Sequence, residues 1–391
     1  MSTPGQESLN VDAAVRERYG AAAEAAEPAL CCPVSYDAKY LEVIPAEIIE
    51  RDYGCGDPSQ YLQPGDDVLD LGSGGGKICY IASQVVGSAG SVVGVDINEQ
   101  MLALASKYQQ EVGEKIGYQN TDFRKGRIQD LKLNMRQFEE FLVENPVNSA
   151  ADWMAAEEAA DRLRLADPLV ADDSMDAVVS NCVLNLVKNE DRRQLFAEVF
   201  RVLKVGGRAI ISDIVSDEEV PPELQNNAEL WSGCISGAFQ EHKFMEAFEE
   251  AGFYGLEIVN RQEEAWAVVE GIEFRSLTVR AWKRADGPCL ERRQAVVYNG
   301  PWKTVMDDDG LQMYRGERMA VCDKTYHLYG QEPYKSQITQ LPPTDPVPLE
   351  EATEFDCNKT ALRDPAESKK GRSALNLLPG SDCCGDGESC C

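Results

Sequence analysis

Short apolar runs alternate with longer amphipathic stretches between residues 63 and 215, and this alternation predicts a parallel α/β sheet. Strands are expected at Val68–Leu71, Ser91–Asp96, near Phe123, Met175–Ser180 and Arg208–Asp213. Their apolar residues fall on both faces, as is typical of parallel strands that are covered by helices on each side. We therefore expect a doubly wound sheet that binds its ligands beyond the carboxyl ends of the strands.

The pattern also predicts elements on either side of this core. Helices are expected at Val11–Ala26 and Ala38–Arg51, and another at Glu190–Leu203 that ends in a glycine cap at Gly206. Two alternating stretches, Tyr254–Asn260 and Phe274–Ala281, predict antiparallel strands that return to the edge of the sheet.

Shifts in composition suggest five regions in the 391 residues. The first three are an N-terminal helical segment with thiols (1–60), a nucleotide-binding core (61–215) with a charged insertion (131–168), and an acceptor-binding extension (216–285). A small β-rich unit (286–338) follows, with strands expected near Gln294–Tyr298 and Arg318–Cys322. The last region is a mostly disordered tail that contains cysteines (339–391).

A glycine-rich turn follows the first strand and predicts a nucleotide site. Gly72, Gly74 and Gly76 remove side chains from the turn, so that the backbone can approach a ligand closely. Asp96 ends the next strand 20 residues later, where such sheets place the carboxylate that binds ribose. Asp70 just before the turn would repel a pyrophosphate, and it suits the cationic sulfonium of S-adenosylmethionine better. With the stretch Leu203–Gly207 before the fifth strand, the chain resembles the class I methyltransferases.

Charge and cysteine content narrow the choice of partners and compartment. The formal net charge of −29 disfavours nucleic acid and anionic membranes as partners. The sequence has neither a bilayer-spanning apolar run nor a signal-peptide core, so we expect a cytoplasmic protein. In a reducing compartment its 13 cysteines point to soft-ligand or redox chemistry. Two histidines leave little room for a histidine zinc site.

Three cysteines from distant segments could meet at the ligand edge of the sheet. Cys55 lies just ahead of the core, Cys182 follows the fourth strand, and Cys234 lies in the extension after the fifth. Trivalent arsenic is soft and takes three thiolates in a pyramid, which leaves its lone pair exposed. That lone pair can attack a sulfonium methyl group in line, a reaction that needs positioning rather than a general base.

These residues also carry a more specific resemblance, to the arsenite S-adenosylmethionine methyltransferases. The matching stretches are Tyr53-Gly54-Cys55-Gly56, Asp70-Leu71-Gly72-Ser73-Gly74, Cys79-Tyr80, Ser180-Asn181-Cys182-Val183-Leu184-Asn185-Leu186, Ile211-Ser212-Asp213-Ile214-Val215 and Leu230-Trp231-Ser232-Gly233-Cys234. The resemblance implies a class I methyltransferase fold and an enzyme that methylates arsenite. It covers residues 10–285 well and the β-rich region weakly.

The resemblance also implies roles for single residues. Cys55, Cys182 and Cys234 would bind arsenic, while Cys31 or Cys32 would join a thiol relay that a reductant of the glutathione or thioredoxin type regenerates. S-adenosylmethionine would contact Tyr53, Asp70, Gly72, Ser73, Gly74, Asp96, Ile97, Met101, Ile128, Gln129 and Asn181. Asp96 would hold the ribose, and Met101 would lie against the adenine.

Some features leave alternatives open. The family usually has a carboxylate shortly after the glycines, where this chain has Lys77 and Ile78, and its insertion at 131–168 is longer. A methyltransferase for another small acceptor and a non-catalytic metalloid-binding thiol protein are the alternatives. Cys289, Cys322 and Cys357 are expected to be incidental, and the protein is expected to be a monomer.

Overall fold

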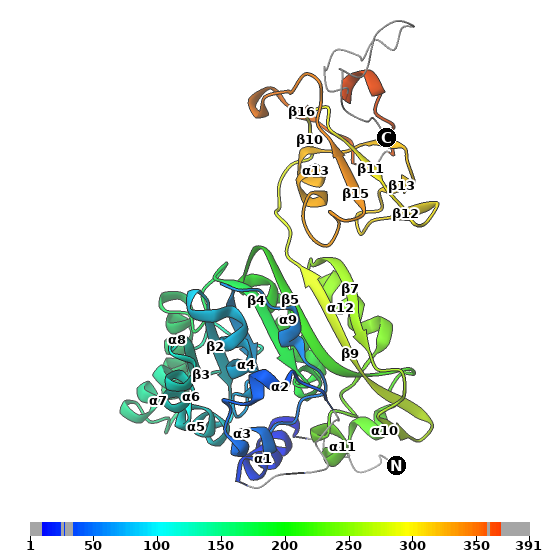
Figure 1. Cartoon of the computed structure of the whole chain (residues 1–391). Coiled ribbons are helices and arrows are strands. Elements are labelled where there is room, and N and C mark those ends of the chain that lie inside the picture. Colours follow the sequence, from blue (N-terminus) through cyan, green and yellow to red (C-terminus); the bar gives the residue numbers. More distant parts are fainter. Residues whose placement is uncertain (1–9, 25–26, 28–33, 358–359, 369–391) are drawn as a thin grey trace, which may run out of the picture. The chain divides into compact units, whose positions relative to one another are not determined.

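The computed structural model describes residues 10–24, 27, 34–357 and 360–368, and the chain divides into two units between Arg284 and Ala285 (Figure 1). The first unit holds the sheet and its helices. The second is smaller and rich in β-strands. Within the described ranges, no helix is long and apolar enough to cross a membrane.

The sheet of the first unit has the strand order β3-β2-β1-β4-β5-β9-β7. These strands are β1 (Asp67–Leu71), β2 (Ser91–Asp96), β3 (Thr121–Lys125), β4 (Met175–Asn181), β5 (Leu203–Ser216), β7 (Tyr254–Arg261) and β9 (Ile272–Trp282), and two short strands, β6 (Phe239–Gln240) and β8 (Ala267–Val269), pair with β5 and β9. Strands β1 to β5 pair in parallel, whereas β9 is antiparallel to both β5 and β7. The predicted doubly wound sheet with antiparallel returning strands is confirmed.

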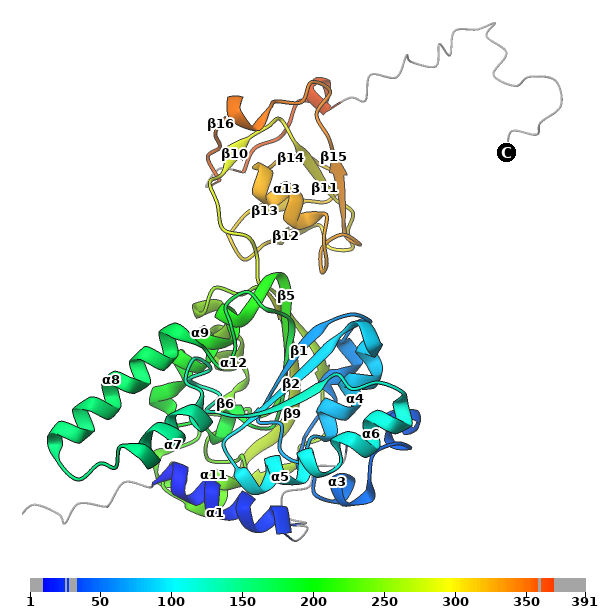
Figure 2. The ribbon, with the colours of Figure 1, turned by 90° about the vertical axis from the view of Figure 1, so that its left-hand side faces the viewer.

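Both faces of the sheet are buried, as the apolar runs predicted. Val68 of β1 belongs to a core shared with α4 (Lys77–Val86), whereas its neighbour Leu69 belongs to a core shared with α9 (Arg192–Val202) and α12 (Glu241–Glu250). Figure 2 shows α4 on one side of the sheet and α9 with α12 on the other. Alternate residues of a strand point to opposite faces, so one strand contributes to both cores.

Further helices flank the sheet, and one prediction among them is wrong. They are α1 (Val11–Glu24), α2 (Ala38–Leu41), α3 (Ala46–Glu50), α5 (Glu99–Lys107), α6 (Gln109–Ile116), α7 (Met135–Glu144), α8 (Ala150–Ala166), α10 (Pro222–Gln225) and α11 (Ala228–Ser232). The single helix expected at Ala38–Arg51 is two, because Pro45 cannot continue a helix and instead precedes α3. The insertion at 131–168 forms α7 and α8.

The glycine cap expected at Gly206 is also absent. Helix α9 ends at Val202, and strand β5 begins at once with Leu203. Gly206 has φ +82°, and its N–H bonds the carbonyl of Lys283, while the Lys283 N–H bonds the carbonyl of Gly207 at 2.9 Å. The glycines therefore shape an irregular start of a strand, where pairing with the neighbouring chain segment outweighs the local helix-ending signal.

Within its described residues, the second unit packs three small sheets and one α-helix around its own core. Its elements are β10 (Leu290–Glu291), β11 (Ala295–Tyr298), β12 (Thr304–Met306), β13 (Gln312–Tyr314), β14 (Arg318–Ala320), α13 (Asp323–Tyr329), β15 (Ile338–Leu341) and β16 (Thr353–Glu354). The order β14-β11-β15 confirms the strands expected at Gln294–Tyr298 and Arg318–Cys322. The expected boundary at 338 is wrong, because β15 crosses it and pairs with β11, and β16 lies beyond it and pairs with β10. A Pro- and acid-rich composition hides these short paired strands.

Candidate active site

A cavity of about 360 Å³ lies at the carboxyl ends of β1, β2 and β4. Its walls come from α1, the loop after α3, the glycine turn, the end of β2, the segment after β3 and the residues that follow β4. This is the edge at which a doubly wound sheet binds its ligands, and the volume suits a small organic molecule.

The glycine turn leaves the floor of this cavity open. Gly72, Gly74 and Gly76 have φ values of +67°, +50° and +87°, which side-chain-bearing residues rarely adopt. A Cβ on Gly72 would lie 2.4 Å from a methyl carbon of Val183, whereas a Cβ on Gly74 would meet no described atom within 4 Å. The Gly74 N–H donates to the Asp96 carboxylate at 2.9 Å. The turn is thus shaped for close approach of a ligand.

Two carboxyl groups line the cavity, that of the buried Asp70 and that of the half-buried Asp96. Burial, together with the charges of Asp96 and Asp52, raises the pKa of Asp70 to about 7, against the hydrogen bond from the Cys79 thiol at 3.2 Å. Burial also raises the pKa of Asp96, although the backbone N–H of Asn98 donates to it at 2.8 Å. A cationic ligand would stabilise the ionised form of both groups.

The cavity has further features that fit a polar nucleoside ligand. Among the described residues, the Ser73 hydroxyl and the Asn98 amide nitrogen are buried without a hydrogen-bond partner. Orphaned polar groups of this kind are costly unless a ligand satisfies them. All the residues predicted for the cofactor line the cavity: Tyr53, Asp70, Gly72, Ser73, Gly74, Asp96, Ile97, Met101, Ile128, Gln129 and Asn181. Their contacts with S-adenosylmethionine remain a prediction.

Two of the three predicted thiols come together beside this cavity, and the third lies in the same buried cluster. Cys55, Cys182 and Cys234 belong to one buried cluster and are 4–5% exposed. The sulfurs of Cys55 and Cys182 lie within 4.8 Å of each other and of a carboxylate oxygen of Asp213. The Cys234 thiol donates to the carbonyl of Cys182 at 3.3 Å. Of the three, Cys182 lines the cavity itself.

Asn181 is the residue that holds the Cys55 loop against β4. Its side-chain oxygen accepts the N–H groups of Cys55 at 2.9 Å and Gly56 at 3.0 Å, and its amide nitrogen donates to the carbonyl of Gly56 at 2.7 Å. A Cβ on Gly54 would lie 2.1 Å from the Asn181 amide nitrogen, and one on Gly56 would lie 2.6 Å from the Ser212 hydroxyl. The Gly-Cys-Gly sequence is therefore required for this close approach.

Two of the thiols sit on unusual backbone. Cys182 has φ +65° and Cys234 has φ +62°. This left-handed region costs a residue with a side chain of the order of 1 kcal/mol or more, and such outliers cluster at functional sites. Glycine would relieve that cost at both positions but would remove the sulfur.

Asp213 is a site residue that sequence reasoning gave no role. It is fully buried, and its carboxylate accepts the N–H groups of Leu184 at 2.9 Å and Asn185 at 3.3 Å. Burial raises its pKa to about 6, against these backbone hydrogen bonds. Its position at the carboxyl-terminal end of β5 was the available signal, since the ends of parallel strands meet at one edge.

Tyr19 is a second residue that sequence reasoning missed. It lies beside the Cys234 thiol, and it lines the cavity. Burial and the neighbouring thiol groups of Cys234 and Cys182 raise the pKa of the phenol, so that it stays a neutral donor. Helix α1 is anchored over the site by Arg18, which donates to the carbonyl of Glu229 at 2.8 Å. Helix periodicity alone gave no sign of this docking. Cys31 and Cys32 lie outside the described residues.

Comparison with known proteins gives a consistent picture. Residues 62–164 and 154–252 match a family described as "Methyltransferase domain", and residues 285–373 match "Domain of unknown function (DUF8838)". An arsenite methyltransferase of Aquipseudomonas alcaligenes is 31% identical over 315 residues, which is 76% of this chain and 80% of that protein. One of Mus musculus is 29% identical over 374 residues, 91% of this chain and 89% of that protein.

The same comparison extends to solved structures. The crystal structure of an arsenic (III) S-adenosylmethionine methyltransferase from Chlamydomonas reinhardtii superposes with a TM-score of 0.53 at 24% identity, covering 83% of this chain and all of that one. At this identity the likeness shows a shared fold.

Proposed function

The chain belongs to the arsenite methyltransferase family, and we propose that it transfers methyl groups from S-adenosylmethionine to trivalent arsenic held by Cys55, Cys182 and Cys234. The observation that supports this proposal is the approach of the Cys55 and Cys182 sulfurs to within 4.8 Å of each other beside the cavity, with Cys234 in the same buried cluster and Cys182 in the cavity wall. Three sulfurs are the ligand set that trivalent arsenic prefers.

The donor site is formed by the floor of the cavity. S-adenosylmethionine supplies an electrophilic methyl group, and in-line attack by the arsenic lone pair forms an As–C bond as the C–S bond breaks. Asp70 balances the positive charge of the donor, and Asp96 accepts hydrogen bonds from its ribose. Ser73 and Asn98 offer the buried polar groups that a ligand would satisfy.

The acceptor site positions the metalloid and keeps water away. Asn181 fixes Cys55, and the Asp213 hydrogen bonds to Leu184 and Asn185 fix the segment after Cys182. Tyr19 lies beside Cys234, and a hydrogen bond donated by its hydroxyl would stabilise a Cys234 thiolate without removing its charge. With the arsenic held in place, methyl transfer needs alignment and desolvation rather than a general base.

A thiol reductant completes the cycle. Transfer of a methyl cation to the arsenic lone pair oxidises arsenic from the trivalent to the pentavalent state. Two thiols that form a disulfide supply the two electrons that restore the trivalent state, and we assign Cys31 or Cys32 to this relay. A reductant of the glutathione or thioredoxin type would then reduce the disulfide, as a cytoplasmic location would allow.

The proposal is tested by following the donor product. Incubation with S-adenosylmethionine and a reductant should release S-adenosylhomocysteine only when arsenite is added. Release with another small acceptor, and none with arsenite, would favour a methyltransferase of different specificity. Arsenite binding without any release would favour a metalloid-binding protein.

A further inference from the structure

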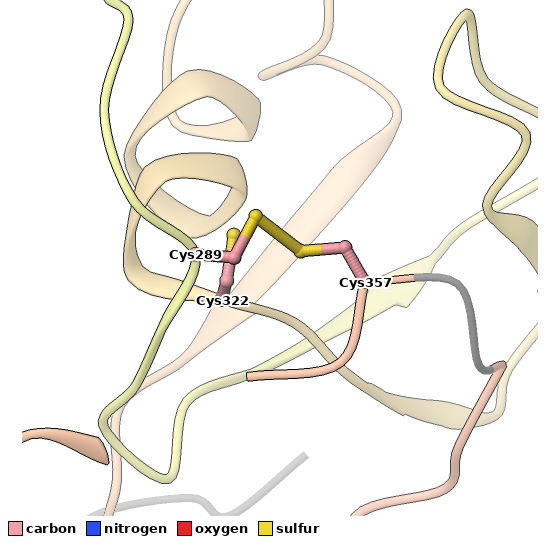
Figure 3. A group of neighbouring side chains, drawn as sticks. All are labelled: Cys289, Cys322 and Cys357. Carbon is pink, nitrogen blue, oxygen red and sulfur yellow. A yellow bond between two sulfur atoms is a disulfide. The ribbon is translucent and has the colours of Figure 1, made fainter. Parts of the chain in front are cut away.

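Three cysteines of the second unit, expected to be incidental, lie together. Cys289 precedes β10, Cys322 precedes α13 and Cys357 follows β16. Their sulfurs all lie within 4.8 Å of one another, and those of Cys289 and Cys357 form a disulfide, with Cys322 beside it (Figure 3). The cysteines come from three segments, so their meeting is a consequence of the fold and not of local sequence.

Pairing of short elements brings the three segments together. Strands β10 and β16 are antiparallel neighbours, and the N–H of Phe355 donates to the carbonyl of Cys289 at 2.8 Å. Arg292, just after β10, pairs with Asp323 of α13 at 2.9 Å. Cys322 is 1% exposed, and its sulfur accepts the N–H of Thr325 at 3.4 Å. The cluster is therefore held by the surrounding fold on each side.

The ligand atoms are all sulfur. Within the described part of the chain, no histidine or carboxylate joins these three cysteines in a common group. Structural zinc sites have four ligands, so three sulfurs alone leave zinc incomplete. Three thiolates suit a soft ion with three bonds and a lone pair, such as trivalent arsenic.

We propose that, once reduced, Cys289, Cys322 and Cys357 form a second binding site for trivalent arsenic, separate from the cysteines that present arsenic for methylation. The choice of arsenic among soft ions rests on the proposed function. Binding balances without a redox step, since arsenous acid and three thiols give three As–S bonds and three molecules of water. The disulfide form cannot bind, and a two-electron reductant of the thiol or phosphine class must first deliver two electrons and two protons to Cys289 and Cys357. The reductant that sustains methylation would thus also reduce this disulfide and allow arsenic to bind.

The test counts arsenic on the full-length chain. A background variant carries serine at the cysteines outside the described residues: Cys31, Cys32, Cys383, Cys384, Cys390 and Cys391. It is reduced with a phosphine, which adds no competing thiol, and then loaded with arsenite and desalted. We expect about two arsenic atoms per chain, about one after either Cys322→Ser or Cys182→Ser, and none with both changes. Prior oxidation with diamide should remove the arsenic that depends on Cys322.

The four chains separate the two proposals. If Cys55, Cys182 and Cys234 do not bind arsenic, the background variant carries one arsenic atom. Cys322→Ser then removes that atom, and Cys182→Ser leaves it in place. If Cys322→Ser loses no arsenic, or if zinc occupies the site instead, the second site is contradicted. Because Cys322 is buried, Cys357→Ser provides a second variant at a half-buried position, and it should lose the same single atom while thermal unfolding reports on the fold.

Discussion

The side chain of Asn181 accepts a hydrogen bond from the backbone N–H of Cys55 at 2.9 Å, across 126 positions of sequence. This bond joins the loop that carries one thiol to the strand end that carries another. It explains why an asparagine precedes Cys182 and why glycines flank Cys55, since side chains on those glycines would collide with their neighbours.

Gly54→Ala should therefore impair catalysis by displacing Cys55. The new methyl group would meet the Asn181 amide nitrogen at 2.1 Å, so the loop must shift. Because reactive alignment is sensitive to displacements of about 1 Å, we expect at least about a tenfold fall in the arsenite methylation rate. Gly65→Ala is the matched control for loss of a glycine, since its Cβ would meet nothing within 4 Å, although its φ of +88° makes a small loss of stability expected there. Equal rates in wild type and Gly54→Ala would contradict the role of the loop.

Replacing one of the three thiols Cys55, Cys182 and Cys234 should impair methylation of arsenite without impairing binding of S-adenosylmethionine. Cys182→Ser and Cys234→Ser exchange a soft ligand for a hard one, and we expect methylation to fall at least about a hundredfold. Binding of S-adenosylmethionine, measured by calorimetry, should change little. The same exchange at Cys289 in the second unit should leave the rate at saturating arsenite unchanged. Full activity of Cys182→Ser would mean that Cys55, Cys182 and Cys234 have only a structural role.

Tyr19→Phe should weaken arsenite binding without breaking the fold. The change removes the hydroxyl beside Cys234 that we propose donates to its thiolate, and a hydrogen bond to a charged group contributes about 1.5–3 kcal/mol. A fall in affinity of about tenfold or more is expected, which quenching of the buried Trp231 can report. Tyr118→Phe removes a phenol that donates to the carbonyl of Ser83 at 3.1 Å, and it serves as the control. Identical affinities for both variants would exclude Tyr19 from the site.

Binding of S-adenosylmethionine should weaken as the pH falls. The pKa of Asp70 without ligand is raised to about 7, so below that pH the group is increasingly protonated and neutral. A cationic donor favours the ionised form, and its affinity should therefore fall by up to about tenfold per pH unit below pH 7. Asp70→Asn should bind weakly with no such slope. A wild-type affinity that is constant between about pH 6 and pH 8 would contradict this role.

The parallel sheet and its ligand edge could be predicted because their signals are local. Val68–Leu71 has apolar residues on both faces, which is typical of a buried parallel strand. The glycines that follow it are typical of a turn that binds a nucleotide. Predictions failed where long-range pairing decided the outcome, as at Gly206, which pairs with Lys283 instead of capping a helix. The strands from residue 338 onward, β15 and β16, were missed for the same reason, since each is short and pairs with a strand distant in the sequence.

The residues of the site also divide into those with a local sequence signal and those that depend on long-range contacts. The proximity of Cys55 and Cys182 could be predicted because both lie in recognisable sequence motifs. Tyr19 was missed because only the docking of α1 through Arg18 brings it to Cys234. Cys322 was dismissed because no spacing in the sequence relates it to its two neighbours. Contacts that depend on packing between elements leave no periodic trace in a single sequence.

The most direct measurement of the central claim is the separation of arsenic species after reaction. Wild type and Cys182→Ser are each incubated with arsenite, S-adenosylmethionine and either glutathione or thioredoxin with its reductase. We predict that wild type converts arsenite to methylated arsenic and that Cys182→Ser leaves it unmethylated while still binding the donor. Absence of methylated arsenic from wild type under every reductant would contradict the account.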